Sequence, residues 1–258
     1  MFTRRDTGAV PLQQQSGVVT GRAQSALTFL LQEAYLACRI HTMKKAAIFD
    51  IDGTILKDMS SERVFFRYLL NKKIITAKDV LRFTTAFTNN LFLLKGIYLR
   101  KNKYYLKNKD YREIVSYVNE CFRDRISPHI SPIALEEMNR LKKAGYMIIL
   151  LSGTLSPLVE CFRKYCNADI GIGTSLGIDK DGAITGEVDG IHAYSGGKVR
   201  VVERIAAEYN LDLPASSAYA NQYLDVKFMR MVGSPVAVNA TRLLRFYAVR
   251  NQWRTVEF

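Results

Sequence analysis

An apolar run that ends in two aspartates constrains this chain more than any other stretch of its sequence. Residues 45–49 are Lys-Ala-Ala-Ile-Phe, and Asp50 and Asp52 follow at once. A short apolar run with β-branched and aromatic members predicts a buried strand. Two carboxylates two positions apart at a strand end repel each other and lose hydration. They therefore need a cation or hydrogen-bond donors between them.

The place of these carboxylates indicates a site for a metal and a phosphate group. At the carboxyl edge of a parallel sheet, paired aspartates form such a site. Gly53 lets backbone N–H groups approach an anion, and Thr54 adds a hydroxyl. The sequence therefore predicts phosphate chemistry at the end of the first strand.

The composition is that of a globular protein with anionic partners. A chain of 258 residues can bury one core with a small second domain, and 48% hydrophobic with 24% charged residues indicates a folded protein. The net charge of +13 favours phosphoesters, acidic membrane surfaces or nucleic acid. No apolar run is long enough to span a bilayer. The four cysteines show neither a zinc pattern nor a disulfide framework, so we expect a cytoplasmic location.

Strand and helix signals alternate after residue 131. Ser131-Pro132 predicts a helix start and Gly145 its end, and further helices are expected from Ser156, over 198–209 and over 241–250. This alternation predicts an α/β fold, a doubly wound parallel sheet with helices on both faces. The apolar runs that predict its later strands are residues 146–151, 170–178, 183–188, 217–220, 235–238 and 255–258.

The segment between the first strand and this alternation carries helical signals throughout. Ser60 or Ser61 is a candidate N-cap with an acid in the first turn, and Thr76–Asp79 resembles a capping box. We expect the N-terminal extension to be a variable, mobile or partly helical addition before a natural start at Met43. Its arginine-rich character is also loosely like that of an organelle transit peptide. The predicted division is an extension of residues 1–42, a core of residues 43–57 and 131–258, and an all-helical insertion of residues 58–130.

The pentapeptide from Asp50 to Thr54 resembles the first motif of the haloacid dehalogenase superfamily of phosphotransferases. Three later features agree with that family in order and spacing: Ser152 after a strand, Lys198 at a helix start, and the run from Tyr219 to Asp225. The last is followed by a Gly-x-Pro-x-Ala-Val-Asn run that is also similar to the family. The resemblance covers residues 45–258 and implies the family's fold.

Within the superfamily, the chain is most similar to the phosphoserine-phosphatase-like group, subfamily IB. The helical insertion after the first motif, Thr185-Gly186 and Trp253 carry this similarity. In the family, an insertion at this point is a cap that closes over the site and selects the substrate. The stretch after Thr54 lacks the acidic cluster that phosphoserine phosphatase uses for serine. The chain therefore looks closer to the broad, poorly assigned phosphatases of the group.

The resemblance implies an Mg²⁺-dependent phosphatase acting on a small or lipid-linked phosphoester. Asp50 would attack phosphorus and form an aspartyl-phosphate. Asp52 would protonate the leaving alcohol and then deprotonate the hydrolytic water. Groups implied to hold the phosphoryl oxygens are Gly53, Thr54, Ser152, Gly153 and Lys198, and those implied to hold Mg²⁺ are Asp50, the carbonyl of Asp52, Asn221 and Asp225.

One of these positions departs from the family pattern. The family's fourth motif begins with an aspartate where this chain has Asn221, and Gln222 replaces a small residue. Asparagine offers a metal a carbonyl oxygen but no charge, so metal binding should weaken by at least about 10–100-fold. One interpretation is a working phosphatase with weaker metal binding. The other is a catalytically weakened protein that serves as a binding or regulatory module. We expect the first, because Asp50, Asp52, Ser152 and Lys198 are all present.

The insertion is rich in lysine and tyrosine. One interpretation of this pattern is a solvated basic face. The other is peripheral contact with an anionic membrane. We expect no nucleic-acid partner, because no motif for one is present. The residues concerned are Lys95, Arg100, Lys101, Lys103, Tyr104, Tyr105, Lys107 and Lys109.

Overall fold

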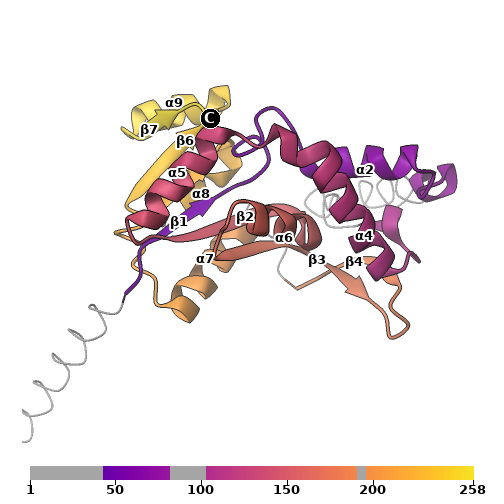
Figure 1. Cartoon of the computed structure of the whole chain (residues 1–258). Coiled ribbons are helices and arrows are strands. Elements are labelled where there is room, and N and C mark those ends of the chain that lie inside the picture. The colour runs from indigo at the N-terminus through magenta and orange to yellow at the C-terminus, as the bar shows by residue number, and fades with distance from the viewer. Residues whose placement is uncertain (1–42, 82–102, 191–195) are drawn as a thin grey trace, which may run out of the picture. The chain divides into compact units, whose positions relative to one another are not determined.

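The computed structural model describes residues 43–81, 103–190 and 196–258, and residues 44–258 form one compact unit (Figure 1). Several expectations lie outside the described residues: those for the extension of residues 1–42, for the continuation of the capping-box helix beyond Leu81, and for Lys95, Arg100 and Lys101. The division of residues 43–258 into a core and a cap stays a prediction.

The unit is built on one seven-stranded sheet with the strand order β4-β3-β2-β1-β5-β6-β7. The β3–β4 pair is antiparallel and every other pair is parallel. The predicted doubly wound α/β fold is therefore confirmed, with β1 in the middle. The strands are β1 Ala46–Phe49, β2 Met147–Leu155, β3 Ile170–Ile178, β4 Ile184–Asp189, β5 Ser217–Ala220, β6 Ser234–Val238 and β7 Arg254–Val256.

Helices cover both faces of the sheet. Along β1, Ala47 and Phe49 pack in the cluster that includes α5 (Pro132–Lys143) and α6 (Ser156–Tyr165). Ala46 and Ile48 point to the other cluster, which includes three further helices. Because successive side chains of a strand point to opposite faces, burial on both faces requires a continuous apolar run. These three helices are α7 Gly196–Tyr209, α8 Val226–Met229 and α9 Arg242–Arg250.

The described parts of residues 58–130 contain helices and turns and no named strand, as the sequence predicts. The capping box is confirmed, because the Asp79 carboxylate accepts the Thr76 N–H at 2.9 Å and the Asp79 N–H lies 3.4 Å from the Thr76 hydroxyl. The helical segments are α2 Ser61–Asn71, η2 Tyr104–Leu106, α4 Tyr111–Cys121, a π-helical turn Phe122–Ile126 and η4 Ser127–His129.

Two local predictions need correction. Ser60 is the N-cap residue of α2, but its side chain does not cap the helix. Strand β2 does not end at Leu151; it continues to Leu155, and its pairing with β3 shifts between these two residues. Ser152 therefore lies in an irregular part of the strand rather than beyond it. The start of α5 is as predicted, because the Ser131 hydroxyl accepts the Ala134 N–H at 3.3 Å.

Among the described residues, no helix combines the length and apolar character needed to cross a bilayer.

Candidate active site

Asp50 lies directly after the central strand, at the carboxyl edge of the sheet. Its backbone N–H donates to the Tyr219 carbonyl on β5 at 2.9 Å. The Phe49 ring stacks on the Tyr219 ring, with centroids 4.1 Å apart. The Asp50 side chain is buried, so it needs partners for its charge. β1 and its neighbour β5 thus fix the backbone from which this carboxylate projects.

Lys198 supplies the main partner. Its Nζ atom lies 2.7 Å from Oδ1 of Asp50 and 2.9 Å from Oδ1 of Asp225. All three side chains are buried. They come from the residue after β1, the first turn of α7 and the end of the short 3₁₀ helix η5 (Tyr223–Asp225), which precedes α8. The fold therefore joins one ammonium group and two carboxylates that are far apart in the sequence.

This cluster changes the acidity of its members. Burial raises the pKa of Asp50 to about 7; the Lys198 ammonium opposes this rise, and the Asp225 carboxylate adds to it. Burial alone would lower the pKa of Lys198, but the Asp50 and Asp225 carboxylates outweigh it, so the pKa is raised. Lys198 is therefore a fixed positive charge beside Asp50.

Asp52 faces a different part of the molecule. Its Oδ1 atom accepts the N–H of Ser61, the first residue of α2, at 2.9 Å, and its Oδ2 atom accepts the Ser60 hydroxyl at 3.3 Å. A carboxylate at a helix N-terminus is favourable because it meets free N–H groups and the positive end of the helix dipole. Burial nevertheless raises the pKa of Asp52, against the effect of these hydrogen bonds. A carboxyl group with a raised pKa suits proton transfer near neutral pH.

The other predicted phosphate-binding residues divide into two sets. Thr54 donates its hydroxyl to Oδ2 of Asp50 at 3.2 Å, and Gly53 has a φ of +81°. Ser152 and Gly153 lie on the neighbouring strand β2, without a hydrogen bond to Asp50 among the described residues. The Ser152 hydroxyl is buried and accepts the Thr154 N–H at 3.3 Å.

Asn221 directly follows β5 and is buried against the first motif. A β-carbon placed on Gly53 would overlap the side-chain amide of Asn221. Oδ1 of Asn221 is buried and has no hydrogen-bond partner among the described residues. A buried carbonyl oxygen without a donor is a free ligand position for a cation.

The oxygen groups around Asp50 fit a hard divalent cation. Asn221 gives this site less negative charge than an aspartate at that position would. No group of three or more His, Cys, Asp or Glu residues in the described part of the chain could hold a metal by itself. The oxygens that could hold a metal together are instead those of Asp50, Asp225, the Asp52 carbonyl and Asn221. Oxygen-only donors are what Mg²⁺ and Ca²⁺ require.

Asn239 is a residue of this region to which sequence reasoning gave no role. It follows β6, and its Nδ2 atom donates to the carbonyls of Gly53 and Thr54 at 3.2 Å each. Its Oδ1 atom accepts the Phe258 N–H at 2.9 Å. Asn239 thus holds the loop after Asp50 in place. One signal could have pointed to it. Asn239 directly follows a predicted strand, as Asp50 does, and these two strands lie two places apart in the sheet.

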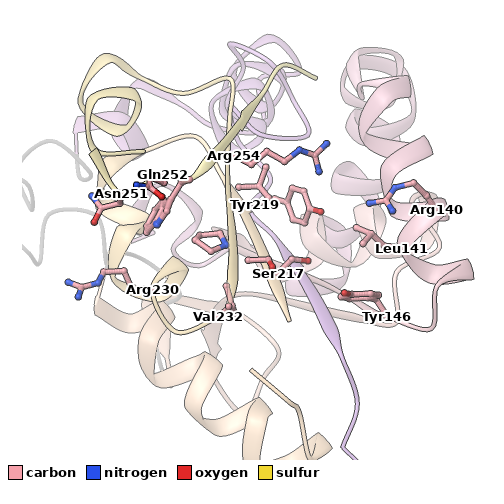
Figure 2. Close-up of a pocket in the computed structure, with 15 residues that line it drawn as sticks. Arg140, Leu141, Tyr146, Ser217, Tyr219, Arg230, Val232, Asn251, Gln252 and Arg254 are labelled. Atoms are coloured by element: carbon pink, nitrogen blue, oxygen red, sulfur yellow. The ribbon is translucent and has the colours of Figure 1, made fainter. Parts of the chain in front are cut away.

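A separate groove of about 730 Å³ lies beside β5, β6 and β7 (Figure 2). Tyr219, Arg140, Arg254 and Trp253 are among its lining residues. None of the predicted catalytic, phosphate-binding or metal-binding residues lines it. We therefore assign the chemistry to the carboxyl edge around Asp50 and not to this groove.

Comparisons with known proteins identify the family of the chain. Residues 47–230 match the model of the haloacid dehalogenase-like hydrolase family. The chain is 29% identical over 225 residues to the inhibition of morphological differentiation protein of Streptomyces azureus, covering 83% of this chain and 79% of that protein. It is 25% identical over 223 residues to histidinol-phosphatase of Neisseria meningitidis serogroup C, covering 84% and 100%.

Solved structures show the same fold at lower identity. A protein of unknown function from Bordetella pertussis Tohama I superposes with a TM-score of 0.72 at 22% identity, covering 83% of this chain and 99% of the other. Phosphoserine phosphatase in its apo form gives a TM-score of 0.55 at 21% identity, covering 83% and 93%.

Proposed function

The chain is a phosphatase of the haloacid dehalogenase-like hydrolase family, and we propose that it hydrolyses phosphomonoesters through a covalent intermediate on Asp50. The observation that carries this proposal is the buried cluster of Asp50, Lys198 and Asp225. The Lys198 ammonium favours the anionic form of the buried, poorly hydrated Asp50 carboxylate against the effect of burial, and the anionic form is the one that attacks phosphorus.

In the first step, an Asp50 carboxylate oxygen attacks phosphorus and the bond from phosphorus to the ester oxygen breaks. Asp52, in its protonated form, gives its proton to the departing alkoxide, so an alcohol leaves. In the second step, the Asp52 carboxylate takes a proton from water, and the resulting oxygen attacks the phosphoryl group. Phosphate leaves and the Asp50 carboxylate is restored, so the two carboxyl groups end as they began.

The remaining residues would stabilise charge on the phosphoryl oxygens. Lys198 supplies a positive charge, and Thr54 supplies a hydroxyl. The backbone N–H groups of Gly53 and Thr54 already donate to the carbonyls of Leu56 and Ile51, at 2.7 Å and 3.1 Å. Ser152 would add its hydroxyl from β2. Asp50, Asp225, Asn221 and the Asp52 carbonyl would hold Mg²⁺, which when bound would withdraw electron density from the phosphoryl group.

The proposed substrate is a small or lipid-linked phosphoester, and the proposed location is the cytoplasm. The relatives named as histidinol-phosphatase and phosphoserine phosphatase act on small phosphoesters by their names, which supports the first part. The alternative, a non-catalytic binding module, would explain Asn221 but not the retained arrangement of Lys198 between Asp50 and Asp225.

The test is hydrolysis of p-nitrophenyl phosphate with Mg²⁺ titrated over several orders of magnitude. We expect turnover that saturates only at high Mg²⁺, and its loss in Asp50→Asn. Asp52→Asn should keep the acceptor for the Ser61 N–H and still lower turnover by about 10²–10⁴-fold. No turnover at any Mg²⁺ concentration, without gain in Asn221→Asp, would support the binding module. Turnover that survives Asp50→Asn would exclude Asp50 as the nucleophile.

A further inference from the structure

Large apolar side chains gather on the solvent side of α9 and on the short 3₁₀ helix η5 (Tyr223–Asp225). Leu243, Phe246 and Val249 of α9 are 69%, 64% and 70% exposed, and Tyr223 and Leu224 are 47% and 46% exposed. We call these five residues the α9 face. The other large apolar side chains of the described chain that are prominently exposed are scattered: Leu81, Ile133, Tyr165 and Ile178.

The arrangement of α9 explains why these side chains are left outside. Leu244 and Ala248 are buried in the core cluster beside β6. Leu243, Phe246 and Val249 recur every three residues, and they lie on the side of the helix away from that core. The rings of Tyr223 and Tyr247 meet edge to face at 5.6 Å, so η5 lies against α9. The α9 face is therefore formed by two adjacent elements. Helix α9 is labelled and drawn in yellow in Figure 1.

The same helix is strongly basic. Arg242, Arg245 and Arg250 are exposed, and α9 contains no acidic residue. The Arg250 guanidinium lies over the Phe246 ring, 5.6 Å from its centroid. Arg245 lies 3.5 Å from Glu257, but both side chains are mostly exposed, so this ion pair is weak. The helix therefore keeps most of its positive charge toward solvent.

We propose that the α9 face docks on an anionic lipid surface. A helix that exposes leucine, phenylalanine and valine between arginines matches the interfacial helices that insert apolar side chains below the headgroups while their basic residues contact anionic lipids. The net charge of +13 acts in the same direction. A second copy of the chain is a poorer occupant, because a two-fold contact would bring the arginines of both helices together.

The α9 face is connected to the candidate active site. Tyr223 and Leu224 lie in the segment between Asn221 and Asp225, and the Thr241 N–H, just before α9, donates to the Asn221 carbonyl at 3.0 Å. Docking therefore holds this loop at the lipid surface. Docking on the lipid surface does not depend on catalysis. The consequence that a lipid-linked phosphoester would reach the active site at that surface rests on the proposed function.

Vesicle co-sedimentation tests the proposal with the full chain. The probes are phosphatidylcholine vesicles with and without phosphatidylserine, at low and high salt. We expect binding to the phosphatidylserine vesicles that falls with salt. The triple variant Leu243→Gln, Phe246→Gln, Val249→Gln should lower the partition coefficient by about a hundredfold. Reversing Arg242 and Arg250 to Glu should lower it by at least about fivefold for each position.

Matched controls separate this effect from a general loss of hydrophobicity or charge. Ile133→Gln with Ile178→Gln removes apolar side chains exposed elsewhere, and Arg112→Glu with Arg125→Glu reverses exposed charges elsewhere. Controls that bind like the parent chain support the proposal, as does unchanged hydrolysis of p-nitrophenyl phosphate by the triple variant. Absence of binding to phosphatidylserine vesicles, or equal loss in the controls, would overturn it. A dimer that the triple variant converts to a monomer would instead assign the α9 face to self-association.

Discussion

The Nζ atom of Lys198 lies 2.7 Å from Oδ1 of Asp50, in a position where both side chains are buried. The two residues are 148 positions apart in the sequence. The sheet topology brings them together, because β1 is the central strand and α7 packs on the face toward which Ala46 and Ile48 point. One ammonium group thus neutralises both Asp50 and Asp225, and in the proposed mechanism this pair connects folding stability with catalysis.

Replacing Lys198 with methionine should therefore impair both properties. Two buried carboxylates lose their cation, and breaking a buried ion pair costs about 3–5 kcal/mol of unfolding free energy. Turnover should fall at least about 100-fold, because the charge beside the phosphoryl group is lost. Urea unfolding and p-nitrophenyl phosphate hydrolysis measure the two effects. Lys180→Met, in an exposed turn, is the control and should change neither. Near-normal turnover in Lys198→Met would contradict the assigned role.

Changing Asn221 to aspartate should strengthen metal binding. The added carboxylate would put a negative charge at the position where Oδ1 now lacks a partner. The Mg²⁺ concentration for half-maximal turnover should fall by about tenfold or more. Without metal the variant should be less stable than the parent, because the new charge is buried, and Mg²⁺ should restore it. Mg²⁺ titrations followed by activity and by thermal unfolding measure both effects; an unchanged Mg²⁺ requirement would remove Asn221 from the metal site.

Alanine at Gly53 should be far more damaging than alanine at Gly145. The two glycines have nearly the same φ, +81° and +82°, so each substitution carries a backbone cost of about 1–2 kcal/mol. The new β-carbon at Gly145 meets nothing within 4 Å, whereas at Gly53 it collides with Asn221. Gly53→Ala should therefore lose further stability and most turnover. Equal unfolding free energies for the two variants would show that the contact with Asn221 does not matter.

Glu137 should make stability depend on pH. Its pKa is lowered by the hydrogen bonds from Arg140, with a further contribution from the Tyr219 hydroxyl at 2.9 Å. A folded-state pKa below the unfolded value means that the ionised form stabilises the fold above about pH 4.3. That stabilisation disappears as the pH falls through the folded-state pKa. Glu137→Gln should thus lose about 1–2 kcal/mol at pH 7 and nothing at the lowest pH. The exposed neighbour Glu136→Gln is the control, and a pH-independent difference would contradict the ionic origin.

The sequence predicted those parts of the molecule that follow from periodicity and strand order. A run of apolar residues at 46–49 predicted a strand buried on both faces. That inference needs only the two-residue period of a strand. The resemblance to the haloacid dehalogenase superfamily implied that Asp50, Lys198 and Asp225 belong to one site, and the three side chains do lie together.

Contacts set by loop conformation could not be predicted in this way. The hydroxyl of Ser60 binds Asp52 instead of capping α2, and the Asp52 carboxylate takes the Ser61 N–H. Asn239 reaches back to the carbonyls of Gly53 and Thr54. These contacts depend on side-chain directions in turns, on which hydrophobic periodicity carries no information. The continuation of β2 past Leu151 involves a local shift in its pairing with β3, which hydrophobic periodicity does not predict either.

Identification of the phosphorylated residue tests the central claim most directly. The enzyme is denatured during turnover of p-nitrophenyl phosphate, treated with sodium borohydride and digested for mass spectrometry. Borohydride reduces an aspartyl-phosphate to homoserine, which marks the residue that carried the phosphoryl group. The account predicts homoserine at position 50, only when substrate is present and not in Asp50→Asn. An active enzyme with an unmodified Asp50, or with the modification at another residue, would contradict it.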